Sequence, residues 1–217
     1  MSFSTNTTLN DTLRFNQNQV WSETDSFALE RYAQFTQYLP QQALSVLDVG
    51  CNTGRGGQVL KQKKPHLKLW GIDMVEDRIR RIPGGVYEHL VAGSATSIPA
   101  EDNSFCAIVA GELVEHIPVA VFPTMLSEFY RVLKPGGRVL LTTPNPKSYL
   151  VYLRKHSIYA DPSHVNIMHQ KQLVDQLTKA GFVSTSVMGS GKVSRHLGDR
   201  FPLFNVYGSY LTISQKQ

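Results

Sequence analysis

Features that define several protein classes are scarce in this sequence of 217 residues. It has two cysteines, Cys51 and Cys106, which form neither a CxxC pair nor a cluster with metal-ligand spacing. No apolar run approaches the ~20 residues that span a bilayer, and the N-terminal stretch lacks a basic start followed by apolar residues. We therefore expect a cytoplasmic chain with buried free thiols, and no disulfide, metal site, membrane span or secretory signal.

Charge of either sign is also limited. Charged residues make up 18% of the chain and hydrophobic residues 41%, and the net charge is +5, as in an ordinary globular protein. Basic residues cluster around 61–68 and at 78–81, but such clusters usually coat a solvated helix face. The charge therefore does not favour nucleic acid as a partner, although an anionic acceptor or a nucleic acid stays open on this evidence alone.

Short apolar segments alternate with amphipathic ones from residue 44 onward, which is typical of βαβ units around a parallel sheet. The segments with strand character are 44–49, 68–72, 87–92, 106–110, 138–143, 182–187 and 206–213. Helical spacing is clearest in 123–133 and 170–180, and Lys134-Pro135-Gly136-Gly137 should stop the first of these helices. We predict an α/β fold with seven strands in one compact unit.

The first forty residues follow a different pattern. They are polar and then weakly helical, with Phe27, Tyr32, Phe35 and Leu39 spaced to fall on one side of a helix that Pro40 ends. This spacing predicts an N-terminal helical cover over residues 1–40 and a second, larger domain over residues 41–217. We expect the cover to pack over the ligand-binding edge of the sheet.

A glycine-rich turn follows the first predicted strand. The sequence Gly50-Cys51-Asn52-Thr53-Gly54 leads into a helix, and glycine is needed where a backbone turns sharply or approaches a ligand closely. Asp73 follows Gly54 by 19 residues, at the end of the second strand. A carboxylate there can accept hydrogen bonds from the two hydroxyls of an adenosine ribose. The pattern predicts a nucleoside-containing cofactor.

Four segments together carry a resemblance to a known family. They are VLDVGCNTG, GIDM, AGSATSIPAEDNSFCAIVAGELVEHI and RVLKPGGRVLLTTPNP. In this order they resemble class I S-adenosylmethionine-dependent methyltransferases, in particular the small-molecule group that includes the ubiquinone-biosynthesis methyltransferases. The resemblance implies a Rossmann-like, seven-stranded, mainly parallel sheet with an antiparallel last strand and helices on both faces. It implies S-adenosylmethionine as the cofactor and leaves the acceptor open.

The resemblance also assigns residues of the glycine-rich turn to the cofactor. Asp48, Gly50, Cys51 and Gly54 would line the methionine part, through backbone groups and the Asp48 carboxylate. Asp73 would bind the ribose hydroxyls. Both expectations place the cofactor at the carboxyl ends of the first two strands.

Further cofactor contacts are implied after the second, third and fourth strands. Met74 would lie against the adenine ring, and Ser94 and Ala95 would contact the adenine edge. An aspartate is common in the family where Ser94 stands, so this contact would be uncharged. Gly111 and Glu112 would flank the methionine and the methyl group.

Two histidines are candidates for the chemistry of methyl transfer. If the acceptor is a hydroxyl, a base helps to remove its proton, and histidine suits this role near neutral pH. His116 follows the fourth strand and is interpreted as structural or as lying beside the methionine. His164, in a segment after the fifth strand, is the favoured residue to contact the acceptor and accept its proton. The long connection 188–205 is predicted to form a substrate wall.

The sequence thus favours a methyltransferase with a small-molecule acceptor, and slightly favours O-methylation of a sugar-containing or phenolic compound. The second of these preferences rests on the TPN run and the DPSHV segment, which resemble methyltransferases of sugar and polysaccharide pathways. The alternatives are methylation of RNA or protein, and a regulatory module that binds S-adenosylmethionine without turnover.

Overall fold

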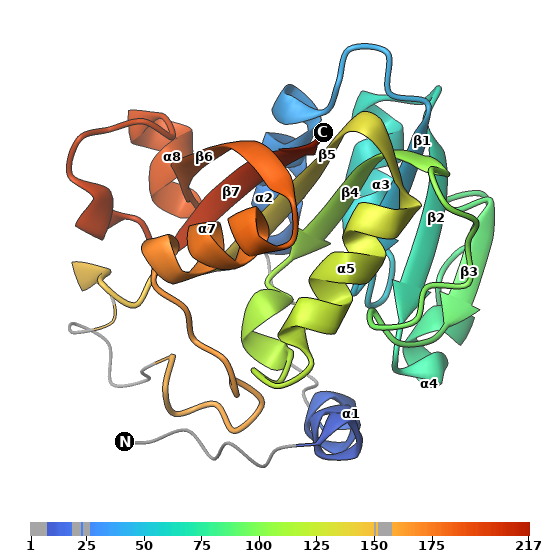
Figure 1. The fold of residues 1–217 in the computed structure, drawn as a ribbon, viewed down its shortest axis with the longest axis horizontal. Helices are drawn as coiled ribbons and strands as arrows, with labels where there is room; N and C mark the ends of the chain where they lie inside the picture. Colours follow the sequence, from blue (N-terminus) through green and yellow to red (C-terminus); the bar gives the residue numbers. More distant parts are fainter. Residues whose placement is uncertain (1–7, 19–22, 24–26, 150, 152–157) are drawn as a thin grey trace.

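The computed structural model describes residues 8–18, 23, 27–149, 151 and 158–217. They form one seven-stranded sheet in the order β3-β2-β1-β4-β5-β7-β6, with helices on both faces (Figure 1). The strands are β1 (Ser45–Val49), β2 (Lys68–Asp73), β3 (His89–Ala92), β4 (Phe105–Gly111), β5 (Leu133–Pro144), β6 (Phe182–Ser190) and β7 (Ser209–Lys216). Strands β1 to β5 pair in parallel, whereas β7 is antiparallel to both β5 and β6. The predicted Rossmann-like α/β sheet with an antiparallel last strand is confirmed.

The helices divide between the two faces of the sheet. They are α1 (Leu9–Gln17), α2 (Phe27–Tyr38), α3 (Arg55–Lys63), α4 (Glu76–Arg80), α5 (Phe122–Val132), α7 (Gln170–Lys179) and α8 (Lys192–Leu197), with 3₁₀ turns η2 (Val114–His116) and η3 (Phe204–Val206). Figure 1 shows α5 and α7 over one face, with α2 and α3 behind the sheet. None of the helices in the described ranges is long and apolar enough to cross a membrane.

Alternate residues of the central strands supply two separate cores. Ile108 and Leu141 pack with the apolar sides of α5 and α7, whereas Val109 and Leu140 pack with those of α2 and α3. All four side chains are fully buried, and burying each stabilises the fold by ~1.5–3 kcal/mol. Because both faces are covered, these strands are nearly continuous apolar runs in the sequence.

Several predicted boundaries need correction. Helix α5 ends before Lys134-Pro135-Gly136-Gly137, as predicted, but this segment is the first part of β5 rather than a separate turn. It is accommodated by a register shift against β4 between Phe105 and Ala107. The last strand begins at Ser209 instead of 206, because η3 precedes it. The connection 188–205 is also more regular than predicted, since β6 runs into it and α8 occupies part of it.

Helices α1 and α2 lie in different places relative to the sheet. Figure 1 shows α1 beyond the edge where the parallel strands end, and α2 along one face. The predicted apolar side of α2 is buried at Tyr32 and Phe35. Residues 1–7, 19–22 and 24–26 of the predicted cover lie outside the described residues. The division into a cover over 1–40 and a domain over 41–217 stays a prediction.

Candidate functional site

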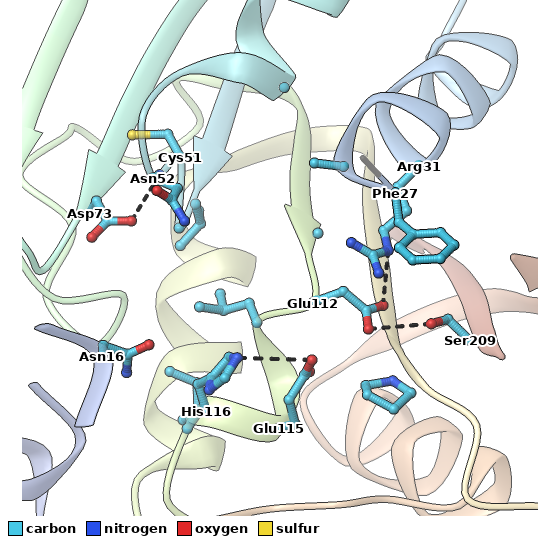
Figure 2. A pocket seen from close by; sticks show the side chains of 18 of the residues that line it. Asn16, Phe27, Arg31, Cys51, Asn52, Asp73, Glu112, Glu115, His116 and Ser209 are labelled. Atoms are coloured by element: carbon cyan, nitrogen blue, oxygen red, sulfur yellow. Dashed lines mark hydrogen bonds and ion pairs between the residues drawn. The ribbon is translucent and has the colours of Figure 1, made fainter. Parts of the chain in front are cut away.

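A cavity of about 500 Å³ opens at the carboxyl edge of the sheet. Its walls come from the loops after β1 to β5 and from α1, α2, the segment around residues 158–164 and the start of α8 (Figure 2). The predicted site residues that line it are Gly50, Cys51, Asp73, Met74, Ser94, Ala95, Gly111, Glu112, His116 and His164. Asp48 and Gly54 are not part of the lining. The cavity therefore brings together ten of the twelve predicted residues.

The turn after β1 has the backbone that its glycines allow. Gly50, Asn52 and Gly54 all have positive φ, of 73°, 50° and 77°, and asparagine tolerates this region better than most residues. A Cβ at Gly54 would lie 2.8 Å from Cγ2 of Ile82. Gly54 therefore lets the turn pack against Ile82, while Gly50, Cys51 and Asn52 face the cavity.

Asp73 ends β2 beside this turn and is 7% exposed. Its Oδ2 accepts a hydrogen bond from the Asn52 backbone N–H at 2.9 Å, and its Oδ1 accepts one from Val75 N–H at 2.9 Å (Figure 2). Burial raises the pKa of the Asp73 carboxyl. Because a carboxylate offers about four lone-pair sites, a fixed Asp73 keeps capacity to accept hydrogen bonds from a ligand in the cavity.

Asp48 lies beneath the turn rather than in the cavity. It is fully buried, and its two carboxylate oxygens accept hydrogen bonds from the Tyr32 and Tyr87 hydroxyls, both at 2.5 Å. Burial raises the pKa of Asp48 to about 7. The predicted direct contact with the methionine part of the cofactor does not match this position. We call Asp48, Tyr32 and Tyr87 the tyrosine clasp.

The residues that follow β2 and β3 form the wall expected to meet the adenine. Met74 and Ala95 present apolar atoms there, and Ala95 is 9% exposed. The Ser94 hydroxyl lies 2.7 Å from the Thr96 hydroxyl and accepts a hydrogen bond from Thr96 N–H at 3.2 Å. Ser94 thus stabilises its own turn, and its contact with an adenine stays a prediction.

Glu112 turns the chain sharply at the end of β4. Its φ is 54°, a left-handed backbone that costs a non-glycine residue ~1–3 kcal/mol. Its Oε1 lies 3.4 Å from Nε of Arg31, and its Oε2 accepts a hydrogen bond from the Ser209 hydroxyl at 3.2 Å (Figure 2). The sequence identified Glu112 but gave no sign of Arg31 or Ser209, which lie far away along the chain.

His116 and His164 come together at the other end of the cavity. Their ring centroids are 5.1 Å apart. Nδ1 of His116 lies 3.1 Å from the Ser163 carbonyl oxygen, and Nδ1 of His164 lies 2.6 Å from that of Ile158. Burial lowers the pKa of His116 to about 4.

Glu115 is a neighbour of both histidines that sequence analysis did not select. It is 1% exposed, and burial raises its pKa well above the ordinary value. Its Oε2 accepts a hydrogen bond from the Thr143 hydroxyl at 3.0 Å. Its backbone carbonyl accepts hydrogen bonds from Val165 N–H at 2.8 Å and Asn166 N–H at 3.0 Å. These bonds tie the His164 segment to the end of β4.

The structure also corrects the interpretation of the basic cluster at residues 78–81. Arg78 is 4% exposed and donates a hydrogen bond to the Asn16 carbonyl of α1, so it does not coat a solvated face. Its Nε lies 3.4 Å from Oε1 of Glu23.

Thr12 and Asn16 of α1 line the cavity, although no motif marks them. Cys106, expected to be buried, is partly exposed, whereas the free thiol of Cys51 is buried.

The residues present fit the expected cofactor, S-adenosylmethionine. The buried Asp73 carboxylate keeps hydrogen-bond acceptors for ribose hydroxyls. The glycine turn presents backbone at Gly50 and Cys51, and Met74 and Ala95 offer an apolar wall. S-adenosylmethionine supplies an electrophilic methyl group on a sulfonium.

The seven-stranded sheet, the glycine turn and the buried aspartate at the end of β2 are together typical of a Rossmann-like S-adenosylmethionine-dependent methyltransferase. Residues 21–187 match the model of a family described as a methyltransferase domain, and the chain belongs to this family. A demethylmenaquinone methyltransferase of Symbiobacterium thermophilum is 30% identical over 191 residues, which cover 71% of this chain and 75% of the relative.

Solved structures agree on the fold. An S-adenosylmethionine-dependent methyltransferase from Archaeoglobus fulgidus superposes with a TM-score of 0.71 at 21% identity, over 92% of this chain and all of that one. A Haemonchus contortus phosphoethanolamine N-methyltransferase in complex with S-adenosylhomocysteine gives a TM-score of 0.68 at 16% identity, over 94% of this chain and 60% of that one.

Proposed function

We propose that the protein transfers a methyl group from S-adenosylmethionine to a hydroxyl of a small molecule, either phenolic or sugar-containing. The observation that carries the proposal is a continuous cavity, which joins the Asp73 end to a polar end at His116, His164 and Ser209. Its volume of about 500 Å³ lies within the ~300–1,000 Å³ typical of small-molecule sites. A small acceptor suits such a cavity better than a polymer does.

The two ends of the cavity divide the work. At one end, Asp73 and the turn at Gly50 hold the cofactor, and Glu112 lies between them and the acceptor. At the other end, an acceptor oxygen must be held ~3–3.5 Å from the methyl carbon and in line with the C–S bond that breaks. His164 and His116 line that end of the cavity. In the proposal they contact the acceptor oxygen, and the sequence-based hypothesis makes His164 the group that accepts its proton.

The relatives support a ring-shaped acceptor. Several of those found are named demethylmenaquinone methyltransferases, including proteins of Symbiobacterium thermophilum and Lactococcus lactis. A reduced quinone carries phenolic hydroxyls on a ring, so it shares the chemistry of a phenolic acceptor. A further relative, from Desulfotalea psychrophila, is named a ubiquinone/menaquinone biosynthesis C-methyltransferase. This name favours a second candidate function, methylation of a carbon in a quinol.

The test is transfer of an isotopically labelled methyl group to a panel of phenols, quinols and sugars, analysed by mass spectrometry. We expect label on oxygen in at least one phenolic or sugar-containing compound, and less label with an Asp73→Ala variant at a cofactor concentration that does not saturate it. If label appears only on a ring carbon, the function is C-methylation of a quinol rather than O-methylation. Label in RNA or protein, with none in the small molecules, would overturn the proposal.

A further inference from the structure

Three potential ligand atoms converge at the acceptor end of the cavity. Glu115, His116 and His164 each offer one, and these atoms all lie within 4.8 Å of one another. Figure 2 shows the Glu115 carboxylate and the His116 ring side by side at the cavity. The three side chains come from η2, which follows β4, and from the segment after β5, so the fold rather than local sequence assembles the group.

The hydrogen bonds of both rings fix which nitrogen faces the group. The Nδ1 atoms of His116 and His164 each contact a backbone carbonyl, at Ser163 and Ile158. A carbonyl oxygen only accepts, so in each ring Nδ1 carries the proton. In a neutral ring Nε2 then has a bare lone pair. Histidines that ligate metals show this arrangement, because a carbonyl at the other nitrogen orients the ring and makes it more basic.

The distance between His116 and Glu115 within the group is too long for a hydrogen bond, since Nε2 of His116 lies 4.0 Å from Oε1 of Glu115. Nε2 of His164 also lies 3.9 Å from Oδ2 of Asp161, a carboxylate outside the group. Lone pairs and carboxylate oxygens therefore face one another across a gap. Ligands at ~2.0–2.2 Å from a metal ion lie ~3–4 Å apart, so an ion would draw these atoms together by roughly 1 Å.

We propose that Glu115, His116 and His164 bind a divalent first-row transition metal ion, such as Mn²⁺, Co²⁺ or Zn²⁺. Two imidazoles favour these ions over Mg²⁺, which prefers a shell of oxygen ligands. The Glu112 carboxylate, which pairs with Arg31, lines the same cavity. Three protein ligands leave coordination positions open toward the cavity, which is the arrangement of sites that bind a substrate oxygen.

The consequence for the reaction rests on the proposed function. A hydroxyl oxygen of the acceptor would occupy an open position on the ion, whose charge favours release of the hydroxyl proton to solvent. The resulting oxyanion is the nucleophile that the methyl carbon requires. A ligated Nε2 cannot also accept a proton, so His164 would be a ligand in place of the base predicted from sequence.

The first experiment measures metal binding without any reaction. Untagged, chelator-treated protein is dialysed against Mn²⁺, Co²⁺, Zn²⁺ or Mg²⁺, and the bound metal is measured by mass spectrometry. We expect one transition-metal ion per chain. The His116→Ala and His164→Ala variants should each lose more than ~100-fold in affinity, because even outer partners of a ligand are worth ~10–100-fold. His66→Ala and His196→Ala remove exposed histidines and should bind as the wild type does.

The site would be overturned if the His116→Ala/His164→Ala double variant bound the metal ion with the same affinity as the wild type. X-ray absorption at the zinc edge of the wild type needs no variant, and we expect two imidazole ligands. A spectrum without imidazole would also overturn it.

The two proposals fail differently. If the protein binds one metal ion per chain but label appears only on a ring carbon, the proposal of O-methylation is wrong and the metal site is retained. Full O-methylation by metal-free protein in chelator would remove the site's role in the reaction and leave the proposed function standing. Calorimetry with S-adenosylhomocysteine on each variant shows whether the cofactor end is still folded.

Discussion

The two ends of the cavity are built in different ways. The cofactor end comes mainly from short stretches at Gly50–Asn52 and Asp73–Met74, which neighbouring parallel strands bring together. The acceptor end joins η2, the segment containing His164, residue 209 and helix α2, which are far apart in the sequence. A local turn with fixed backbone forms the first, whereas long-range hydrogen bonds such as Val165 N–H to Glu115 O hold the second. We therefore expect substitutions at the two ends to separate binding from turnover.

The largest expected effect is at the acceptor end. His164→Ala should lower the methylation rate by ~10²–10⁴-fold, because a side chain that assists deprotonation contributes about that much. The affinity for S-adenosylhomocysteine, measured by calorimetry, should not change. His196→Ala, at an exposed histidine of α8, serves as the control. A rate within a few-fold of wild type, or a parallel loss of cofactor affinity, would break the comparison.

The next effect is at the cofactor end. Asp73→Ala should weaken binding of S-adenosylhomocysteine by ~1–3 kcal/mol, because hydrogen bonds from the ribose to a buried carboxylate are lost. The control is Asp77→Ala, since this side chain is 85% exposed on α4. Asp73→Asn keeps one acceptor oxygen and should bind with intermediate affinity in the same calorimetric titration. Unchanged affinity in both Asp73 variants would contradict the ribose assignment.

A third effect concerns the tyrosine clasp, which lies beneath the glycine turn and acts on stability rather than on turnover. With the pKa of Asp48 raised to about 7 in the folded state, the native protein holds a proton between about pH 4 and 7 that the unfolded chain has released. Stability should therefore fall as pH rises through this window, by up to ~1.4 kcal/mol per pH unit from this group. In urea titrations at several pH values, Asp48→Asn should lose this part of the slope. An identical slope in the variant would contradict the prediction.

The smallest effect is at the outer wall. Arg195 of α8 lies 3.0 Å from Glu30, but its side chain is 58% exposed, and exposed ion pairs are worth ~0–1 kcal/mol. Arg195→Ala should leave cofactor affinity unchanged and lower the melting temperature little. The start of α8 lines the cavity, whereas Arg195 does not. A large loss of turnover in this variant would extend the substrate wall to Arg195.

The sequence predicted the fold well because each strand is an apolar run bounded by turn residues. It failed where two signals overlapped, as at Lys134-Pro135-Gly136-Gly137. These residues end α5 and also begin β5. Proline and glycine mark the end of a helix, but only the pairing with β4 shows that a strand starts at once.

The site residues show the same difference between local and long-range signals. Gly50 and Asp73 line the cavity together, as the sequence indicated, because their motifs are contiguous and their strands adjacent. Asp48 was misplaced because strand alternation sets it on the same face as Val46, under α2, where Tyr32 reaches it. Arg78 looked solvated because its partner Asn16 lies 62 residues away. Contacts over such distances leave no local pattern in a sequence.

The tyrosine clasp also constrains how this protein can evolve. A Cβ at Gly56 would overlap the ring of Tyr32, and one at Gly57 would overlap that of Tyr87. The first turn of α3 thus carries a glycine opposite each tyrosine that holds Asp48. A side chain at Gly56 requires a smaller residue at Tyr32, and one at Gly57 requires a smaller residue at Tyr87. We therefore expect the two residues of each pair to be substituted together. Gly56 and Gly57 look like part of the cofactor motif in the sequence. In the structure, each is required because a tyrosine ring packs against it.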